Sequence, residues 1–379
     1  MNIIYISQVD FDNKNDGVAK KVLTQLKAFT KLGIDADYFD YSERIACVNY
    51  INSVAKKVDR KRGFLKRTVF WKSINCYLKD KSYDYAYIRY PYFDKRVLEV
   101  AKTLRSHGTR IILEVPSFPI KFSLLPLKEK MLFMIDYFYQ KKVTHYIDDI
   151  IYIGNETDNI FGKKGKRIYN GIPDAVLEIG QTGFNYDFKS INMIAVSSMT
   201  SSHGYERIIR GIYNYYHTNG PKKNINLYLV GSGRSEKQYR YLVKKYCLNE
   251  RVSFCGPLCG KKLEELFEVA TIGLGCFGLY KNGSNDVSSL KAKEYLMRGL
   301  PFVNSGYEIG IDNDFEFQLA IPNNSAPVDI DKVIDFVDRI AKYDKKTISA
   351  NMREFALANM TWESIFIHYL PFLNTNHEK

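Results

Sequence analysis

No apolar run in this sequence is long enough to cross a membrane as a helix. The longest apolar stretches, such as residues 131–135, stop far short of the ~18 residues that a membrane-spanning helix needs. The N-terminus has the pattern of a short strand and not of a signal peptide. We therefore expect a cytoplasmic protein.

Cysteine is also scarce. Six cysteines among 379 residues are too few for a disulfide framework. Cys255 and Cys259 lack a second pair at zinc spacing, so we interpret all six as reduced thiols and expect no metal site. The composition is otherwise globular, 45% apolar and 26% charged, and the length allows two domains with a core each.

Acidic residues are outnumbered by basic ones. The net charge is +13, and +10 of it lies in residues 1–180. Segment 56–72 holds eight basic residues, one acid and interleaved aromatic residues. This mixture suits an anionic membrane surface, but it also suits a solvated helix face over an ordinary core. In the membrane interpretation the lipid-facing residues are Arg60, Lys61, Arg62, Lys66, Arg67 and Trp71.

Several common motifs are missing. The opening strand lacks Gly-x-Gly-x-x-Gly, and the turn at Gly231-Ser-Gly233 lacks the third glycine, which argues against a dinucleotide-dependent dehydrogenase. No Gly-x-Ser-x-Gly elbow of a serine hydrolase is present. The basic surplus is not accompanied by a zinc finger, an RNA-binding motif or a basic heptad repeat, so we expect no nucleic-acid partner.

Strand and helix patterns alternate through two halves of the chain, which predicts an α/β protein with parallel sheets. The turn at Asn170-Gly171-Ile172-Pro173 separates the halves. We expect a basic N-terminal domain over 1–172, a C-terminal domain over 173–355 and a terminal helical segment over 356–379. A helix rich in aromatic residues over 122–142 is either core or membrane-facing, and the core interpretation is favoured. The expected strands are 3–6, 34–39, 85–88, 110–113, 191–197, 225–230, 251–254, 271–274 and 302–303.

Residues 285–301 are the most informative segment, because Asp286 and Glu294 stand eight positions apart around a helix start. On one continuous helix they would lie ~12 Å apart, beyond the ~5–9.5 Å of paired glycosidase carboxylates. That spacing suits the two ends of an elongated ligand. A helix N-cap is the alternative interpretation of Asp286, and a surface helix position that of Glu294.

The residues between the two acids are small or apolar. They leave the N–H groups of Ser289, Leu290 and Lys291 at a helix N-terminus, which is a site for an anion such as a diphosphate. The arrangement fits a nucleotide sugar. Asp286 would face the sugar, and Glu294 would bind the ribose hydroxyls.

This segment resembles the signature of the retaining GT-B glycosyltransferases of family 4, an acidic pair followed by Gly-x-Pro, which is Gly299-Leu300-Pro301 here. The resemblance implies two Rossmann-like doubly wound domains that face a central cleft. The first acid of the family is usually Glu. Because it is Asp286 here, its reach toward the sugar is one methylene shorter.

Other positions resemble the family in order and spacing. Gly17 before its helix matches the glycine loop near the donor, and Leu258 lies where relatives enclose the base. Where the family has a Gly-Arg pair and a Lys-Gly pair for the diphosphate, this chain has Ser198 and His203-Gly204. His203 is either a hydrogen-bond donor to a phosphate or an ordinary loop residue, and Lys291 and Arg234 are candidate replacement cations.

The resemblance implies a retaining transferase that moves a sugar from a nucleoside diphosphate, expected to be UDP, to a glycan acceptor. We expect a lipid-linked acceptor in bacterial surface polysaccharide synthesis, at the inner face of the plasma membrane. No cofactor or metal is expected, since the four Asp-x-Asp pairs in the chain are scattered. The rival function is a nucleotide-sugar epimerase on the same architecture. Glu114 belongs to a Glu-x-Pro-x-x-Pro segment like that of polysaccharide transferases, and we favour a solvated strand end over a catalytic role for it.

Overall fold

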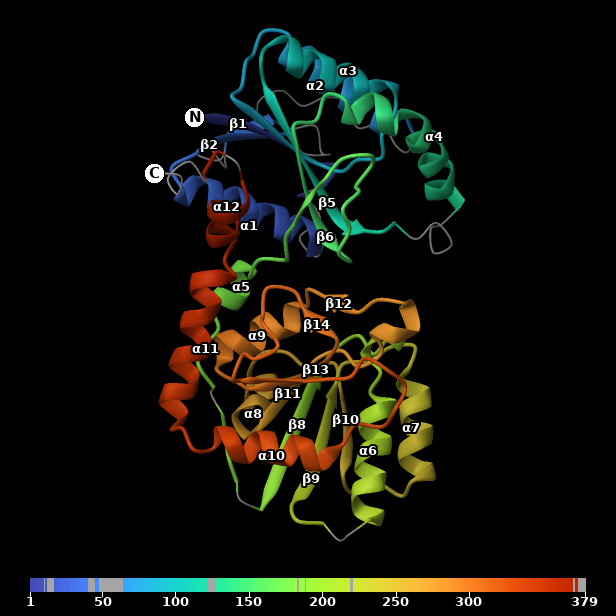
Figure 1. Ribbon diagram of the computed structural model, residues 1–379, viewed down its shortest axis with the longest axis vertical. Coiled ribbons are helices and arrows are strands. Elements are labelled where there is room, and N and C mark those ends of the chain that lie inside the picture. Colours follow the sequence, from blue (N-terminus) through green and yellow to red (C-terminus); the bar gives the residue numbers. More distant parts are fainter. Residues whose placement is uncertain are drawn as a thin grey trace. The chain divides into compact units, whose positions relative to one another are not determined.

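A computed structural model describes residues 1–9, 11, 17–39, 45–47, 64–120, 127–182, 184–187, 189–218, 221–370 and 372–373. The chain forms two compact units (Figure 1). Unit 1 comprises Met1–Tyr169 with Trp362–Lys379, and unit 2 comprises Asn170–Thr361. The boundaries expected from the sequence, at 172/173 and 355/356, stay predictions. No helix among the described residues is both long and apolar enough to span a bilayer.

Unit 1 is built on a seven-stranded sheet with the order β3-β2-β1-β4-β5-β6-β7. All neighbouring strands are parallel except β2 and β3, which are antiparallel. The strands are β1 (Asn2–Ile6), β2 (Asp35–Phe39), β3 (Ile45–Cys47), β4 (Tyr85–Arg89), β5 (Arg110–Phe118), β6 (Asp149–Gly154) and β7 (Lys166–Arg167). The helices are α1 (Gly17–Lys31), α2 (Phe64–Leu78), α3 (Lys95–Ser106), α4 (Leu127–Thr144) and α12 (Trp362–Tyr369).

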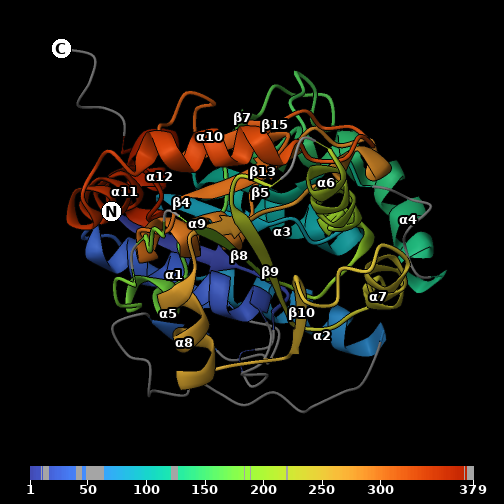
Figure 2. The same cartoon turned by 90° about the horizontal axis from the view of Figure 1, so that it is seen from below.

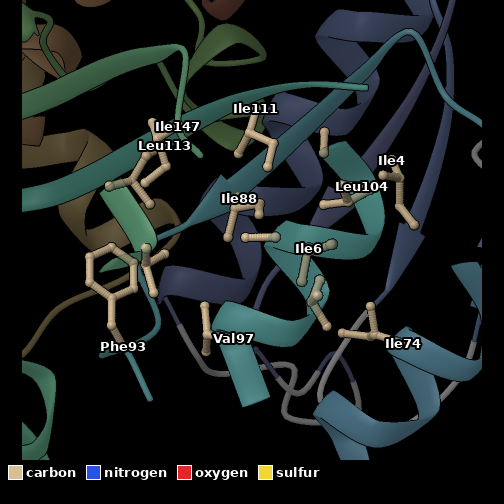
Figure 3. Packing of buried hydrophobic residues seen from close by; sticks show 14 of the residues in the cluster. Ile4, Ile6, Ile74, Ile88, Phe93, Val97, Leu104, Ile111, Leu113 and Ile147 are labelled. Carbon is tan, nitrogen blue, oxygen red and sulfur yellow. The ribbon is translucent and has the colours of Figure 1, made fainter. Parts of the chain in front are cut away.

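The core of unit 1 lies on both faces of this sheet, because the central strands are apolar at nearly every position. On one face, isoleucines and leucines of the strands meet α2 and α3. Figure 3 shows Ile4, Ile6, Ile88, Ile111 and Leu113 of the strands with Ile74, Val97 and Leu104 of the helices. On the other face, Phe29 of α1 stacks on Phe366 of α12 with ring centroids 4.5 Å apart. The C-terminal helix therefore belongs to the core of unit 1.

The membrane-facing prediction for segment 56–72 is wrong at Arg67 and Trp71. Trp71 is 1% exposed and packs in the core of unit 1. Arg67 is also buried, because it pairs with Asp94 at 3.1 Å and donates to the carbonyl oxygens of Pro91 and Tyr92. The helix turns its apolar side and this arginine inward. Arg60, Lys61, Arg62 and the side chain of Lys66 lie outside the described residues.

The core interpretation of the helix over 122–142 is wrong for one of its sides. The helix, α4, begins at Leu127 in the described part of the chain. Val143 is in the core, but a row of apolar side chains on the opposite side is exposed to solvent. The pattern of α4 is apolar on both sides, so its periodicity did not reveal which side faces the core.

Unit 2 contains a six-stranded parallel sheet with the order β10-β9-β8-β11-β13-β15. Helices α6, α7 and α10 lie on one side of the sheet and α8 and α9 on the other (Figure 2). The strands are β8 (Ser190–Val196), β9 (Asn224–Val230), β10 (Val252–Gly256), β11 (Ile272–Leu274), β13 (Phe302–Ser305) and β15 (Gln318–Ile321). The helices are α5 (Asp174–Leu177), α6 (Glu206–His217), α7 (Glu236–Lys245), α8 (Lys261–Val269), α9 (Leu290–Arg298), α10 (Ile330–Ile340) and α11 (Lys345–Asn359).

The strand order of unit 2 is the 3-2-1-4-5-6 order of a doubly wound sheet. The direction of winding reverses between β8 and β11, and ligands of such sheets bind beyond the carboxyl ends of the strands at this switch point. A separate two-stranded ladder of β12 (Asp286–Val287) and β14 (Tyr307–Glu308) belongs to the connections that follow β11 and β13. The expected strands of both halves are confirmed.

Candidate active site

The loops that follow β8 and β11 are in direct contact at the switch point of unit 2. The N–H of Phe277 donates to the carbonyl oxygen of His203 at 2.9 Å, and the N–H of Gly278 donates to that of Ser202 at 3.0 Å. Gly204 has φ +61°, and a Cβ there would lie 2.5 Å from the backbone nitrogen of Gly278. This close approach needs glycine, and it fixes the position of His203.

His203 is a neutral imidazole with a defined tautomer. Its Nδ1 accepts the backbone N–H of Thr200 at 2.9 Å, so the ring proton lies on Nε2. Burial, together with the nearby charge of Lys291, lowers the pKa of His203 to about 3. The residue can therefore offer one uncharged N–H donor to a ligand.

Lys291, in the first turn of α9, turns its side chain toward the same loops. Its Nζ donates to the carbonyl oxygen of Gly275 at 3.1 Å and to the hydroxyl of Tyr205 at 3.2 Å. These bonds hold a positive charge near the end of β11. Lys291 is thus placed to act on an anion at this edge through its field, while its hydrogen bonds go to the protein.

The N-terminus of α9 is capped by Ser289, whose side chain accepts the N–H of Ala292 at 3.2 Å. The alternative interpretation of Asp286 as the N-cap is therefore wrong. Glu308 accepts the backbone N–H of Ser289 at 2.6 Å and its hydroxyl at 2.9 Å. The Ser289 amide is thus already used, so an anion at this helix end would meet the N–H groups of Leu290 and Lys291, which donate to no acceptor within the described residues.

A buried ion pair fixes this helix start from behind. Lys293 Nζ lies 3.4 Å from Glu308 Oε1, and both side chains are excluded from solvent. Burial raises the pKa of Glu308 and lowers that of Lys293, while each charge opposes the shift of the other. Removing either partner would leave a buried charge alone, so the pair holds the first turn of α9 in one position.

Asp286 lies on the strand β12 and not on a continuous helix. β12 pairs in parallel with β14, with Asp286 opposite Tyr307. Asn323 supports the preceding residues by donating to the carbonyl oxygen of Ser284 at 2.8 Å and to Asn285 Oδ1 at 2.9 Å. Asp286 is half-buried there. The β12–β14 ladder sets the position of Asp286, while helix α9 sets the position of Glu294.

Glu294 is held by a residue to which the sequence interpretation gave no role. Arg298 donates from Nε and Nη2 to the same oxygen, Oε1 of Glu294, at 3.0 and 2.9 Å. The guanidinium also binds Glu264 of α8 at 2.7 and 2.9 Å and stacks on Phe267 at 3.7 Å. The second oxygen of Glu294 accepts no hydrogen bond from any described residue. The i,i+4 spacing of Glu294 and Arg298 is the signal that could have revealed this pair.

The remaining predicted donor-binding residues lie on different elements. Ser198 follows β8, and its carbonyl oxygen would be 1.9 Å from a Cβ at Gly233, so the turn after β9 packs on the end of β8. Arg234 is exposed in that turn, and Leu258 is half-buried in the loop after β10. Gly17 is the first residue of α1 in unit 1. Unit 2 therefore brings together the loop ends that carry Ser198, His203, Arg234, Leu258 and Lys291, and Gly17 belongs to the other unit.

Glu114 is not a solvated strand end. Its carboxylate is fully buried and binds Lys21 at 3.0 Å and Arg89 at 2.6 Å. It also accepts from the hydroxyl of Tyr87 at 2.7 Å and the amide of Gln25 at 2.8 Å. The sequence prediction failed here because the cations come from α1 and β4, which are far away along the chain.

No group of three or more His, Cys, Asp or Glu residues is gathered as a metal site would require, within the residues that the structure describes.

No family model and no curated protein matches this sequence. Solved structures do match over nearly the whole chain. The Anabaena protein HepE in complex with UDP is 12% identical, with a TM-score of 0.61 over 99% of this chain and 100% of that one. The lipopolysaccharide outer core galactosyltransferase WaaB is 14% identical, with a TM-score of 0.58 over 94% and 95%. Sucrose-phosphate synthase from Thermosynechococcus elongatus is 16% identical, with a TM-score of 0.55 over 97% of both chains. The chain thus has the GT-B fold, with two Rossmann-like domains.

The neutral His203 leads to a prediction about pH. If this site binds a nucleoside-diphosphate sugar such as UDP-glucose, the affinity should stay constant between about pH 5 and pH 8, because an imidazole with a pKa of about 3 does not change its charge there. UDP-glucose is the suitable probe since its diphosphate does not titrate in this range either. Calorimetric titrations at several pH values measure the affinity. Binding that strengthens as the pH falls through 6.5, the ordinary pKa of His, would show that His203 binds as a cation instead.

Proposed function

We propose that this chain is a retaining glycosyltransferase of the family 4 type that uses a nucleoside-diphosphate sugar, with UDP as the nucleotide. The observation that carries the proposal is the start of α9. There, two backbone N–H groups donate to no acceptor among the described residues, and one turn later Glu294 has one oxygen that none of those residues binds. HepE, a structural neighbour, is described in complexes with UDP and with UDP-glucose, which supports the choice of ligand.

The proposed reaction depends on stabilising the departing diphosphate. As the bond to the sugar breaks, negative charge grows on the phosphate oxygens, and the N–H groups of Leu290 and Lys291 with the helix dipole stabilise it. His203 adds a neutral donor, and the charge of Lys291 adds a favourable field. Asp286 binds the sugar, and Glu294 anchors the ribose through Oε2 while Arg298 holds Oε1.

We also propose that transfer needs no divalent metal and no other cofactor, since the helix start and Lys291 take the place of a cation at the phosphates. The Asp-x-Asp pairs support this where the structure describes their partners. Asp329 caps α10 by accepting the N–H of Lys332, and Asp37 accepts the hydroxyl of Tyr83 at 2.6 Å. These carboxylates are engaged in structural contacts.

For the acceptor we propose a glycan, lipid-linked, in the synthesis of a bacterial surface polysaccharide. The similarity to WaaB, whose description is a lipopolysaccharide outer core galactosyltransferase, supports this direction. The basic surplus of residues 1–180 supports an association with an anionic membrane surface.

Replacing Asp286 by Ala should lower transfer at least ~10-fold and leave UDP affinity nearly unchanged, because its proposed partner is the sugar and not the nucleotide. Release of UDP from a panel of donor sugars in the presence of candidate acceptors measures transfer, and calorimetry measures affinity. An equal loss of UDP affinity in this variant would mean that Asp286 is a structural residue of the β12 ladder.

Incubation of each donor alone distinguishes the rival function, a nucleotide-sugar epimerase, from the proposed transferase. An epimerase converts the donor to an isomeric nucleotide sugar without any acceptor, while a transferase returns it unchanged or releases UDP. Isomerised donor would overturn the proposed transfer reaction.

A further inference from the structure

We propose that helix α4 lies on the surface of an anionic lipid bilayer, through a row of exposed side chains that we name the outer face of α4. The outer face consists of Leu127, Met131, Met134, Tyr137 and Phe138. None of these residues belongs to segment 56–72. The proposal does not depend on the transfer reaction or on the nucleotide site, which lie in unit 2.

The outer face is far more exposed than large apolar side chains usually are. Its five side chains are between 61% and 78% exposed, although each could bury a large apolar area. Contiguous apolar surface on a monomeric protein commonly marks an interaction site with another protein or a membrane. Helix α3 packs between α2 and α4, so α4 ends this row of helices in unit 1 (Figure 1).

The helix cannot turn to bury this face, because its opposite side is fixed to unit 1. The fully buried carboxylate of Asp136 accepts the backbone N–H of Phe93, and it also accepts the side-chain amide of Gln140 at 2.7 Å. About two turns further on, Val143 and Thr144 are buried as well. The exposure of the outer face is therefore a property of the folded unit.

The charges of α4 complement an anionic surface. Lys141 and Lys142 are exposed in the last turn, about one turn after Tyr137 and Phe138. Glu129 accepts the hydroxyl of Tyr92 at 3.4 Å, and Asp136 points inward, so both acids of the helix are engaged with unit 1. Apolar and aromatic side chains bordered by lysines are the composition of helices that lie in the membrane interface.

An apolar pocket of about 790 Å³ lies beside the outer face. Phe133, Tyr137 and Phe138 of α4 form one wall, while Phe118 contributes from the end of β5 and Phe161 from the loop after β6. This volume is in the range that holds small ligands, and its aromatic lining suits a hydrocarbon chain. A lipid chain that leaves the bilayer could enter the pocket directly.

A second copy of this chain is the other candidate for covering the outer face. Positions 127, 131, 134 and 138 follow the four-three-four spacing by which helices pair. The lysines and the open pocket favour the bilayer, since a helix partner would leave the pocket unfilled.

The test uses the full-length chain and vesicles of phosphatidylcholine with or without phosphatidylglycerol, separated by flotation. The wild type should float with anionic vesicles at low salt. A variant with Met131→Ser, Met134→Ser and Phe138→Ser should bind these vesicles at least about tenfold more weakly, because its apolar contact with the bilayer is removed. A variant with Lys141→Gln and Lys142→Gln should lose the preference for anionic over neutral vesicles.

Tyr241→Ser is the matched control, since Tyr241 is 63% exposed on α7 of unit 2, and it should bind vesicles as the wild type does. The melting temperature of each variant without ligand reports on folding. Its rise on addition of UDP reports on the nucleotide site. A wild type that stays in solution, or a serine variant that floats as well as the wild type, would overturn the proposal. A dimer in light scattering that the serine variant dissociates, without vesicle binding, would assign the outer face to a second copy and also overturn it.

Discussion

Replacing Glu294 by Ala is expected to weaken UDP binding by about 2–4 kcal/mol, which is roughly a 30- to 1000-fold increase in Kd. The carboxylate is 21% exposed, and Arg298 holds it through one oxygen only. The second oxygen would accept the ribose hydroxyls in charge-assisted hydrogen bonds. Its removal therefore costs both bonds and also leaves the buried guanidinium of Arg298 with Glu264 as its only carboxylate partner among the described residues.

Calorimetric titration with UDP measures this effect. Glu354→Ala is a matched control, because Glu354 is exposed on α11 of the same unit and should leave the affinity unchanged. Glu294→Gln should fall between the wild type and the alanine variant, since an amide oxygen can still accept a neutral hydrogen bond. An unchanged affinity in Glu294→Ala would remove this residue from the nucleotide site.

Replacing Glu114 by Ala is expected to destabilise unit 1 by about 3–5 kcal/mol. The variant would leave the mostly buried Lys21 and Arg89 without their shared counter-charge, and the hydroxyl of Tyr87 without its acceptor. The effect should extend to α12, because Lys21 Nζ also lies 5.1 Å from the ring of Trp362. Differential scanning calorimetry of the whole chain would show unit 1 unfolding at a lower temperature than in the wild type.

The control for this substitution is Glu99→Ala, an exposed position on α3 of the same unit. An equal transition temperature in the two variants would contradict a stabilising role for Glu114. The network also predicts the response to acid. Burial raises the pKa of Glu114, but the charges of Lys21 and Arg89 lower this pKa to about 2, against an ordinary value of 4.5. The stabilisation should be complete above pH 4.5 and should be lost as the pH falls toward 2.

The doubly wound architecture could be predicted because parallel strands buried on both faces are continuous apolar runs, as residues 3–6 and 225–230 show. The start of α9 could be located because small polar residues precede its apolar positions. Both signals are local, since they depend on residues that are neighbours along the chain.

The buried charge networks could not be predicted, because their members meet only in the folded sheet. Lys293 of α9 and Glu308 of β14 are 15 positions apart along the chain. Glu114 and its partner Lys21 are 93 positions apart. For α4 the difficulty is different. Both of its sides are apolar, so hydrophobic periodicity alone does not say which one is exposed.

The most direct test of the central claim is a crystal structure of the protein with UDP. We predict that the diphosphate accepts hydrogen bonds from the N–H groups of Leu290 and Lys291, and that both ribose hydroxyls lie within hydrogen-bond distance of Glu294 Oε2. Arg298 should still bind Oε1. UDP bound away from the start of α9, or a ribose that does not contact Glu294, would contradict the proposed site.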